Sequence, residues 1–368
     1  MATPKTPEDF RTSVNDALAA RPADLSLARD LLAGSSGRPC YVVGRNAESL
    51  SLVGRFRIDG LVDDFAAAGS TWNGLPAVAA NRLAPDAVVV NCSTSISPVA
   101  VAQRLTAAGI VSIVPLCDLI HAADGAIPWP AFVSQQREDW RLHQDEWVEL
   151  FGGMQDEESR RTLLDVVRYR LTADPRFMGA YAVRVQEQYF EPFLDLRSEV
   201  FVDAGGFDGD TTQEFCRRCP DYRKVFLFEP SQRNMQAARM RLAGLRDIAF
   251  RTEALSDEVG VMRFDAEAGS ASAATSGPGE EVQVTTLDQA LDEPVSFIKM
   301  DLEGWEMKAL AGGRRRIRED RPKLAIAVYH QAADFRTVAA FARAIHPDYR
   351  LHLRHYTQGW SETVMFLV

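Results

Sequence analysis

The chain has 368 residues, of which 46% are hydrophobic and 25% charged, and its formal net charge is −10. This length predicts two domains of roughly 100–200 residues each, and the composition is that of an ordinary globular protein. The acidic excess argues against nucleic-acid binding, and the sequence has no apolar run of the ~18 residues that a membrane-spanning helix needs. Because the N-terminus lacks the apolar core of a signal peptide and the five cysteines are scattered, we expect a cytoplasmic protein with reduced thiols.

Residues 1–127 are predicted to form a Rossmann-like domain. After a helical segment over residues 7–32, interrupted at Pro22, short apolar strands alternate with helices as far as Ala123. Such alternation predicts a parallel sheet with helices on both faces. The expected strands cover Pro39–Gly44, Ile58–Asp63, Asp86–Asn91 and Ile110–Pro115, and the expected helices cover Asn46–Val53 and Pro98–Ala108.

Polar residues follow three of these strands, around Gly44, Asp63 and Asn91. Ligands of parallel sheets bind at the carboxyl ends of strands, so one interpretation is a ligand site, as in the nucleotide-sugar or cofactor-binding domains that this part loosely resembles. The other is a docking or dimerisation platform, which we favour because Gly44 stands alone where a dinucleotide fingerprint needs two or three glycines. This interpretation allows a homo-oligomer that forms through this domain or through the helices that follow it.

Residues 128–187 are predicted to form a helical connector. Ser134–Leu150 and Asp156–Leu171 carry apolar residues at helical spacing, separated by charged positions. These helices are expected to form a layer between two domains rather than a cofactor site. Tyr189 comes directly after them and is expected to fold over the ligand loop described next.

Residues 201–212, Phe-Val-Asp-Ala-Gly-Gly-Phe-Asp-Gly-Asp-Thr-Thr, indicate a buried strand, a glycine-containing turn and the start of a helix. Gly205 and Gly209 permit unusual backbone conformations and close approach of a ligand, and the helix start at Thr211 points free N–H groups into the same space. The glycine spacing fits neither a dinucleotide fingerprint nor a P-loop. The acids of the turn, Asp203 among them, would repel a pyrophosphate but suit a cationic sulfonium with ribose hydroxyls.

The next strand, Lys224–Phe228, is apolar and is followed by Glu229 and a proline. In a doubly wound sheet this strand end lies beside the preceding strand-to-helix turn. Glu229 is therefore predicted to accept hydrogen bonds from both hydroxyls of a ribose.

The remaining C-terminal elements continue the alternation of strands and helices. Between two expected hairpin strands, the glycine-rich segment Ala268–Gly279 is either a lid over the substrate or a surface loop. The last two strands are expected to close the sheet as an antiparallel pair. The predicted strands are Ile248–Glu253, Val259–Phe264, Glu281–Thr286, Ser296–Asp301, Lys323–Tyr329, Tyr349–Tyr356 and Thr363–Val368, and the predicted helices are Trp305–Arg318 and Asp334–Ile345.

Asp301, Glu303 and His330 follow two neighbouring strands and are the expected catalytic residues, because the carboxyl ends of parallel strands meet at one edge. Histidine is the common base for removing a hydroxyl proton near neutral pH. The alternatives are a structural histidine, and carboxylates that pair with Lys299 or cap the following helix. The same three side chains could also ligate a magnesium- or manganese-like ion, but we assign no metal to the site.

Six segments in this order resemble the FkbM-type S-adenosylmethionine-dependent methyltransferases, and the resemblance covers residues 188–368. It implies a class I methyltransferase fold, with S-adenosylmethionine held by Asp203, Gly205, Gly209, Thr211, Glu229, Ala254 and Tyr189 and with Ala254 along the adenine. Where the family usually has Gly-Ala, this chain has Gly205-Gly206, which is expected to loosen the turn. The six segments are Val202–Thr211, Phe228–Pro230, Ala254–Asp257, Thr286–Asp288, Ile298–Gly304 and Val328–His330.

The sequence therefore predicts an α/β protein with two Rossmann-like domains joined by a helical connector. Its expected activity is an S-adenosylmethionine-dependent O-methyl transfer to a hydroxyl of a sugar, glycan or secondary metabolite. A non-catalytic assembly or binding protein that retains the methyltransferase fold is the alternative. A nicotinamide-dependent oxidoreductase that uses the N-terminal domain is disfavoured by the missing glycines.

Overall fold

The computed structural model describes residues 4–35, 37–264 and 280–368, and the chain divides into two compact units. Unit 1 comprises Met1–Gly152, Arg160–Val185 and His355–Glu362, and unit 2 comprises Gly153–Ser159, Gln186–Arg354 and Thr363–Val368. The segment Ala268–Gly279, for which a lid or surface loop was expected, lies outside the described residues.

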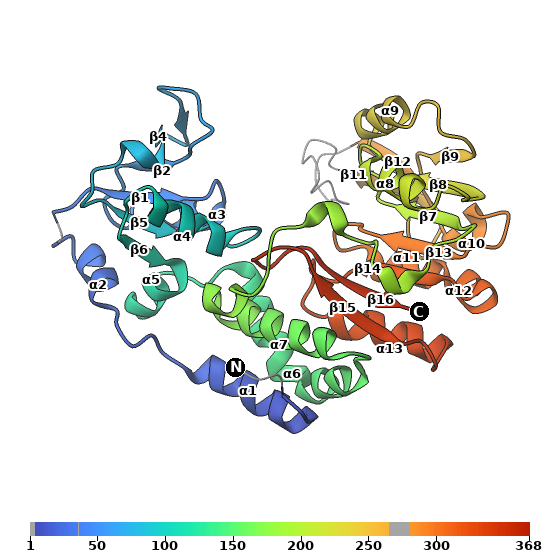
Figure 1. Cartoon of the computed structure of the whole chain (residues 1–368), viewed down its shortest axis with the longest axis horizontal. Coiled ribbons are helices and arrows are strands. Elements are labelled where there is room, and N and C mark those ends of the chain that lie inside the picture. Colours follow the sequence, from blue (N-terminus) through green and yellow to red (C-terminus); the bar gives the residue numbers. More distant parts are fainter. Residues whose placement is uncertain (1–3, 36, 265–279) are drawn as a thin grey trace. The chain divides into compact units, whose positions relative to one another are not determined.

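Unit 1 contains a six-stranded sheet in the order β3-β4-β2-β1-β5-β6, coloured blue to teal in Figure 1. All neighbouring strands are parallel except β3 and β4, which form a short antiparallel hairpin that the sequence did not predict. The prediction of a parallel sheet with alternating helices is confirmed. The elements in chain order are α1 (Pro7–Ala19), α2 (Ser26–Leu32), β1 (Cys40–Val43), α3 (Ala47–Leu52), β2 (Gly60–Val62), β3 (Thr71–Trp72), β4 (Leu75–Val78), η1 (Ala80–Arg82), β5 (Val88–Asn91), α4 (Pro98–Ala107), β6 (Ser112–Pro115) and α5 (Leu116–Ala122).

Two long helices follow, α6 (Ala131–Gly153) and α7 (Glu157–Thr172), and then the short turns η2 (Pro175–Met178), η3 (Val185–Glu187) and η4 (Pro192–Leu194). In α1, the side chain of Phe10 is fully buried against two aromatic rings of α6, with centroids 5.9 Å from Trp140 and 4.5 Å from Phe151. Because α6 buries this face against α1, most of the segment expected to be a separate connector packs as part of unit 1.

Unit 2 contains a seven-stranded sheet in the order β15-β16-β14-β13-β7-β8-β9, with β15 and β16 in red in Figure 1. The strands from β14 to β9 are parallel to their neighbours, whereas β16 runs antiparallel to β14. Arg350 and Val368 exchange backbone hydrogen bonds in both directions, as expected for an antiparallel β15–β16 pair. The elements are β7 (Val200–Ala204), α8 (Asp210–Arg218), β8 (Lys224–Phe228), α9 (Gln232–Arg241), β9 (Ile248–Arg251), β10 (Ala254–Leu255), β11 (Gly260–Phe264), β12 (Glu280–Thr285), α10 (Leu287–Ala290), β13 (Phe297–Met300), α11 (Glu306–Gly312), α12 (Arg314–Asp320), β14 (Lys323–Ala327), α13 (Asp334–Ile345), β15 (Leu351–His355) and β16 (Thr363–Leu367).

Residues 305–318, predicted as a single helix, form two helices that meet at Gly313. Gly313 has φ −105° and ψ 10°, and a Cβ there would lie 2.9 Å from the side chain of Leu287, so the break in the helix also allows close packing against Leu287. The predicted hairpin is present as antiparallel β11 and β12, which form a separate three-stranded sheet with β10. None of the described helices is both long enough and apolar enough to cross a membrane.

The strand ends of unit 1 are covered by the chain itself. The backbone N–H groups of Gln358 and Trp360 donate to the carbonyls of Ile96 and Thr94, and the Gln358 side chain accepts from the N–H of Ala100 in the first turn of α4. A Cβ on Gly359 would lie 2.0 Å from the carbonyl oxygen of Ser95, so only glycine fits this approach. The segment His355–Glu362 thus lies at the strand ends for which one interpretation of the sequence was a ligand site.

The polar residues named at these strand ends also have partners within the chain. Asn46 donates to the carbonyl of Cys92 and accepts from the N–H of Ser49, Arg45 pairs with Asp63 at 2.6 Å, and the Asn91 side chain donates to the carbonyl of Pro98. This bonding supports a structural role for them.

His355 gives unit 1 a pH dependence that can be measured. Its ring is buried beside Tyr181, and burial together with the charges of Arg170 and Arg184 lowers the pKa of His355 to about 3. A lowered histidine pKa means that the unfolded state binds the proton more tightly. The stabilisation is therefore complete above the unfolded pKa of ~6.5 and is lost as the pH falls from there toward 3.

We expect the free energy of unfolding to fall by about 2 kcal/mol between pH 7 and pH 5 through this group. Urea denaturation of the wild type and His355→Gln at both pH values measures this. The variant should lose less stability over the interval than the wild type, and equal losses would contradict the assignment.

Candidate functional site

The turn after β7 is held tightly against β13. Gly205 has φ 82°, and a Cβ there would lie 1.9 Å from the backbone oxygen of Asp301, so the close approach requires glycine. Gly206 faces Leu227, which would lie 2.5 Å from an added Cβ. The Gly205-Gly206 pair therefore allows dense packing of the turn, not the loosening that the sequence suggested. Gly209, at φ 84°, faces Ala238 of α9 and Leu242 directly after this helix, so its small size serves packing between α8 and α9.

Asp203 is fully buried at the centre of the sheet and is bonded to protein on both oxygens. Its Oδ1 lies 3.0 Å from Lys299 Nζ, and its Oδ2 accepts from Thr212 Oγ1 at 2.7 Å. Lys299 Nζ also donates to the carbonyl of Gly205 at 2.7 Å. Burial opposes the charge of Lys299, but Asp203 and Asp301 raise its pKa above the usual value. Asp203, predicted to bind cofactor, links β7 to Lys299 of β13 and to Thr212 of α8, and Lys299 pairs with it rather than with Asp301.

Glu229 lies at the end of β8, as predicted, and its carboxylate is fixed by the backbone. Its Oε1 accepts from the N–H of Ser231 at 2.8 Å, and its Oε2 accepts from the N–H of Phe207 at 3.0 Å. Burial raises the pKa of Glu229, and the two backbone donors partly offset this effect. Phe207 has φ 43° and its side chain is partly exposed, so Glu229 lies directly beside an open part of the turn.

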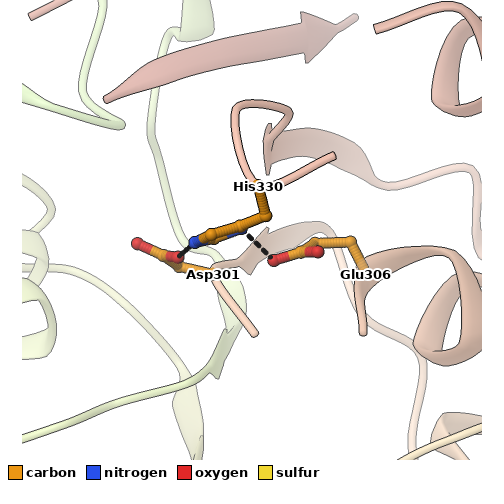
Figure 2. Close-up of side chains that lie close together, drawn as sticks. All are labelled: Asp301, Glu306 and His330. Carbon is orange, nitrogen blue, oxygen red and sulfur yellow. Dashed lines mark ion pairs between the residues drawn. The ribbon is translucent and has the colours of Figure 1, made fainter. Parts of the chain in front are cut away.

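Three carboxylates surround the imidazole of His330 at the ends of β13 and β14. Nδ1 lies 3.0 Å from Glu306, and Nε2 lies 3.2 Å from Glu303 and 3.5 Å from Asp301. Figure 2 shows that Asp301 and Glu306 approach opposite nitrogens of the ring. Asp301 and Glu303 are 22% and 26% exposed, whereas Glu306 is fully buried. Asp301, Glu303 and His330, which were predicted from the sequence, thus lie together in the structure. We call these three residues and Glu306 the acid–histidine cluster.

The acid–histidine cluster keeps its imidazole charged but leaves it poorly bonded. Burial opposes the positive charge, but contacts with Glu303 and Glu306 and the field of Asp301 raise the pKa of His330 to about 11. Although the distances are short, neither ring nitrogen makes a hydrogen bond of good geometry, and Glu306 Oε2 has no partner among the described residues. Charge attraction therefore holds the ring more than directional hydrogen bonding does.

Tyr189 is connected to the site by a hydrogen bond to Asp301. Its hydroxyl donates to Asp301 Oδ2 at 2.7 Å, and Lys299 Nζ lies 5.2 Å from the centre of its ring. Tyr189 adopts φ 72°, a conformation uncommon for a residue with a side chain, which is consistent with a position imposed by the site. The other two predicted cofactor residues are half-buried: Thr211 donates to Asp210, and Ala254 lies on β10 in the small sheet.

The sequence missed Glu306 and Thr212. Glu306 is the first residue of α11 and its Oε1 accepts from the N–H of Leu302 at 2.7 Å. An acid at a helix start is usually a solvated group that stabilises the helix dipole, so its complete burial had no sequence signal. The spacing Asp301, Glu303, Glu306 was the one available hint, because the turn at Glu303 and Gly304 (φ 53° and 94°) folds all three toward His330.

The seven-stranded sheet with its antiparallel β16, the glycine turn after β7 and the acid at the end of β8 together define a methyltransferase fold. The crystal structure of methyltransferase FkbM from Methylobacillus flagellatus KT is similar with a TM-score of 0.75 and 23% identity, covering 98% of this chain and 100% of that chain. Residues 203–357 match the family model of the methyltransferase FkbM domain. The resemblance to FkbM methyltransferases that the sequence segments indicated is thus confirmed for residues 203–357.

Two other solved structures match about half of the chain. Aeropyrum pernix fibrillarin, described with natively bound S-adenosyl-L-methionine, is 11% identical over 50% of this chain and 71% of that chain, with a TM-score of 0.34. An rRNA methylase from Streptococcus thermophilus is 17% identical over 47% of this chain and 87% of that chain, with a TM-score of 0.31. No curated protein matches the chain.

Proposed function

We propose that this protein transfers a methyl group from S-adenosylmethionine to a hydroxyl group of a sugar, glycan or secondary metabolite. The observation that carries the proposal is Glu229, held at the end of β8 beside the β7–α8 turn within an FkbM methyltransferase domain. Each oxygen of its carboxylate accepts one backbone N–H, and a carboxylate oxygen has a second lone pair. Glu229 can therefore accept both ribose hydroxyls without giving up its existing hydrogen bonds.

In this reaction the acceptor oxygen attacks the methyl carbon as the carbon–sulfur bond breaks. The bonding electrons remain on sulfur, which leaves S-adenosylhomocysteine, and the hydroxyl proton passes to a base. The protein must hold the two reacting atoms in line and accept this proton.

Glu303 suits the role of base better than His330. With its pKa raised to about 11, the imidazole of His330 holds its proton at neutral pH and cannot accept another. Asp301 already accepts from Tyr189, whereas the contact of Glu303 among the described residues is with His330. We therefore propose that Glu303 takes the acceptor proton, while the His330 ring, 3.2 Å away, positions its carboxylate.

Calorimetric titration with S-adenosylmethionine, S-adenosylhomocysteine and NAD tests the cofactor, and transfer of a labelled methyl group to a panel of glycans and polyhydroxylated small molecules tests the reaction. We expect binding of the first two ligands and transfer to a hydroxyl acceptor. Binding without any transfer would favour the non-catalytic alternative, and binding of NAD alone would contradict the proposal.

Glu229→Ala should weaken S-adenosylmethionine binding by ~2–4 kcal/mol, because two charge-assisted hydrogen bonds to the ribose are lost. Glu229→Gln, which keeps one acceptor oxygen but no charge, should give a smaller loss. Calorimetry measures both, with Glu258→Ala, an exposed acid near β11, as the matched control. An unchanged dissociation constant in Glu229→Ala would remove the assignment of the ribose site.

We further infer that unit 1 is a Rossmann-like platform without a nucleotide of its own. The support is that His355–Glu362 covers its strand ends and that their polar side chains are bonded within the chain. Self-association of identical chains through this unit is the assembly we propose, and analytical ultracentrifugation measures it. The acceptor and the methyl donor are the expected ligands, with no nucleic acid among them.

A further inference from the structure

Asp301, Glu306 and His330 each offer one ligand atom, and these atoms lie within 4.8 Å of one another. Ligands of a six-coordinate ion with bonds of ~2.1 Å lie about 3–4.2 Å apart. Because Asp301 faces Nε2 and Glu306 faces Nδ1, the imidazole would have to turn for one nitrogen to join both carboxylates on a single ion. Figure 2 shows the side chains of Asp301 and Glu306 beside the ring of His330. The turn between Asp301 and Glu306 brings these two acids together, and the fold places them against His330 after the neighbouring strand.

Three polar atoms of this group are buried and make no hydrogen bond within the described part of the chain, although the ring nitrogens lie within ion-pair distance of the acids. Both ring nitrogens of His330 and Glu306 Oε2 are shielded from solvent and make no hydrogen bond among the described residues. The His330 side chain is 8% exposed and that of Glu306 is 0% exposed. Buried polar atoms are nearly always satisfied, and a bound ion is one of the few groups that would satisfy a nitrogen and a carboxylate oxygen at once.

The charge of the cluster favours a cation. Asp301, Glu303 and Glu306 bring three carboxylates to one imidazole. Lys299, the nearby cation, already donates to Asp203 and to the carbonyl of Gly205. Even with the imidazole of His330 charged, three carboxylates share one positive charge, and a further cation would reduce their mutual repulsion.

We propose that Asp301, Glu306 and His330 bind a divalent cation of the manganese or magnesium class. An imidazole nitrogen binds a metal ion only without its proton, so the ion would take the place of one proton of His330. That nitrogen and the two carboxylates form a mixed oxygen and nitrogen set of the kind that manganese accepts, and the remaining positions would be left to water or to the acceptor. This differs from the assignment of no metal made from the sequence, in which no local signal places Glu306 beside His330.

In the proposed methyl transfer, the cation would make the acceptor hydroxyl more acidic, which Glu303 alone cannot do. A hydroxyl oxygen bound to a divalent ion loses its proton more easily, so Glu303, 3.2 Å from the same histidine, would accept a proton from an acidified hydroxyl. The oxygen then bonds to the methyl carbon while sulfur keeps the electron pair of the broken bond. This role rests on the proposed function, but binding of the ion does not.

Titration of the purified full-length protein with Mn²⁺, followed by the loss of the free-ion signal in electron paramagnetic resonance, tests the site without any activity measurement. We expect about one ion per chain and a dissociation constant at least ~10-fold higher in Asp301→Asn, Glu306→Gln and His330→Ala. Glu319→Gln is the matched control, since this acid lies on exposed α12 beside Arg315. Glu303→Gln should also retain the ion, because Glu303 is the base and not a ligand.

Circular dichroism establishes folding of each variant. If Glu306→Gln does not fold, Asp301→Asn decides the question, because its side chain is partly exposed and tolerates the change better. Absence of Mn²⁺ binding in the wild type, or equal affinity in all variants, would overturn the proposal. Calorimetry with S-adenosylmethionine on the same samples distinguishes the ion proposal from the proposed function. Binding of S-adenosylmethionine without binding of Mn²⁺ would contradict only the ion proposal. Binding of Mn²⁺ without binding of S-adenosylmethionine would contradict only the proposed methyl donor.

Discussion

Replacing Glu303 with glutamine is expected to lower kcat for methyl transfer by about 10²–10⁴-fold, the usual contribution of a positioned general base. Glutamine keeps the size of the side chain and its contact with His330 but cannot accept a proton. The dissociation constant of S-adenosylmethionine should change little, because Glu229, the proposed ribose ligand, lies at the end of a different strand. Initial rates at saturating donor and acceptor, together with calorimetry, measure the two effects separately.

The matched control is Glu319→Gln, which makes the same chemical change on the exposed face of α12 and should retain wild-type kcat. If Glu303→Gln keeps full activity while His330→Ala loses it, the base is His330, as the sequence suggested. The raised pKa of His330 in its acid environment would then have to fall when the acceptor binds.

Lys299→Met is expected to reduce the free energy of unfolding by about 3–5 kcal/mol, because it leaves the Asp203 carboxylate buried without its charged partner. Both side chains of this pair are shielded from solvent, and Nζ also holds the turn through the carbonyl of Gly205. Urea denaturation at pH 7 measures the loss. Methionine is chosen because it fills nearly the same volume, so the change removes charge and hydrogen bonds rather than packing.

Two comparisons test the physical reason for that loss. Lys299→Met combined with Asp203→Asn should recover part of the stability, because the second change removes the unpaired charge. Arg315→Met, which breaks the exposed pair with Glu319, should cost about 1 kcal/mol or less. A Lys299 variant as stable as the Arg315 variant would show that the buried pair does not stabilise the fold.

The order of helices and strands could be predicted from the sequence because most elements have a recognisable pattern of apolar residues. The helix predicted at Asp334–Ile345 has the same bounds in the structure, since apolar positions recur on one face, and β7 and β8 were visible as apolar runs. The hairpin of β3 and β4 was missed because its strands are short and only partly buried, which leaves little alternation to detect.

The site was predicted less completely because its chemistry depends on burial and partners. Glu229 could be placed by the end of its strand, and it is there. Asp203 carries an equally polar side chain, but its two oxygens are occupied by Lys299 and Thr212, which no local pattern reveals. Glu306 was overlooked for the opposite reason: a residue type common on helix surfaces is buried here beside His330.

The division of the chain into units bears on how this protein can be cut or recombined. His355–Glu362 completes unit 1, although it is bounded on both sides by strands of unit 2, and Gly153–Ser159 belongs to unit 2, although it lies between helices that are mostly in unit 1. A fragment ending near residue 187 would therefore leave the strand ends around Ser95 uncovered, and the complementary fragment would carry an unsupported loop. Exchange of a catalytic half between relatives would succeed only if residues 355–362 came from the parent that supplies the N-terminal half.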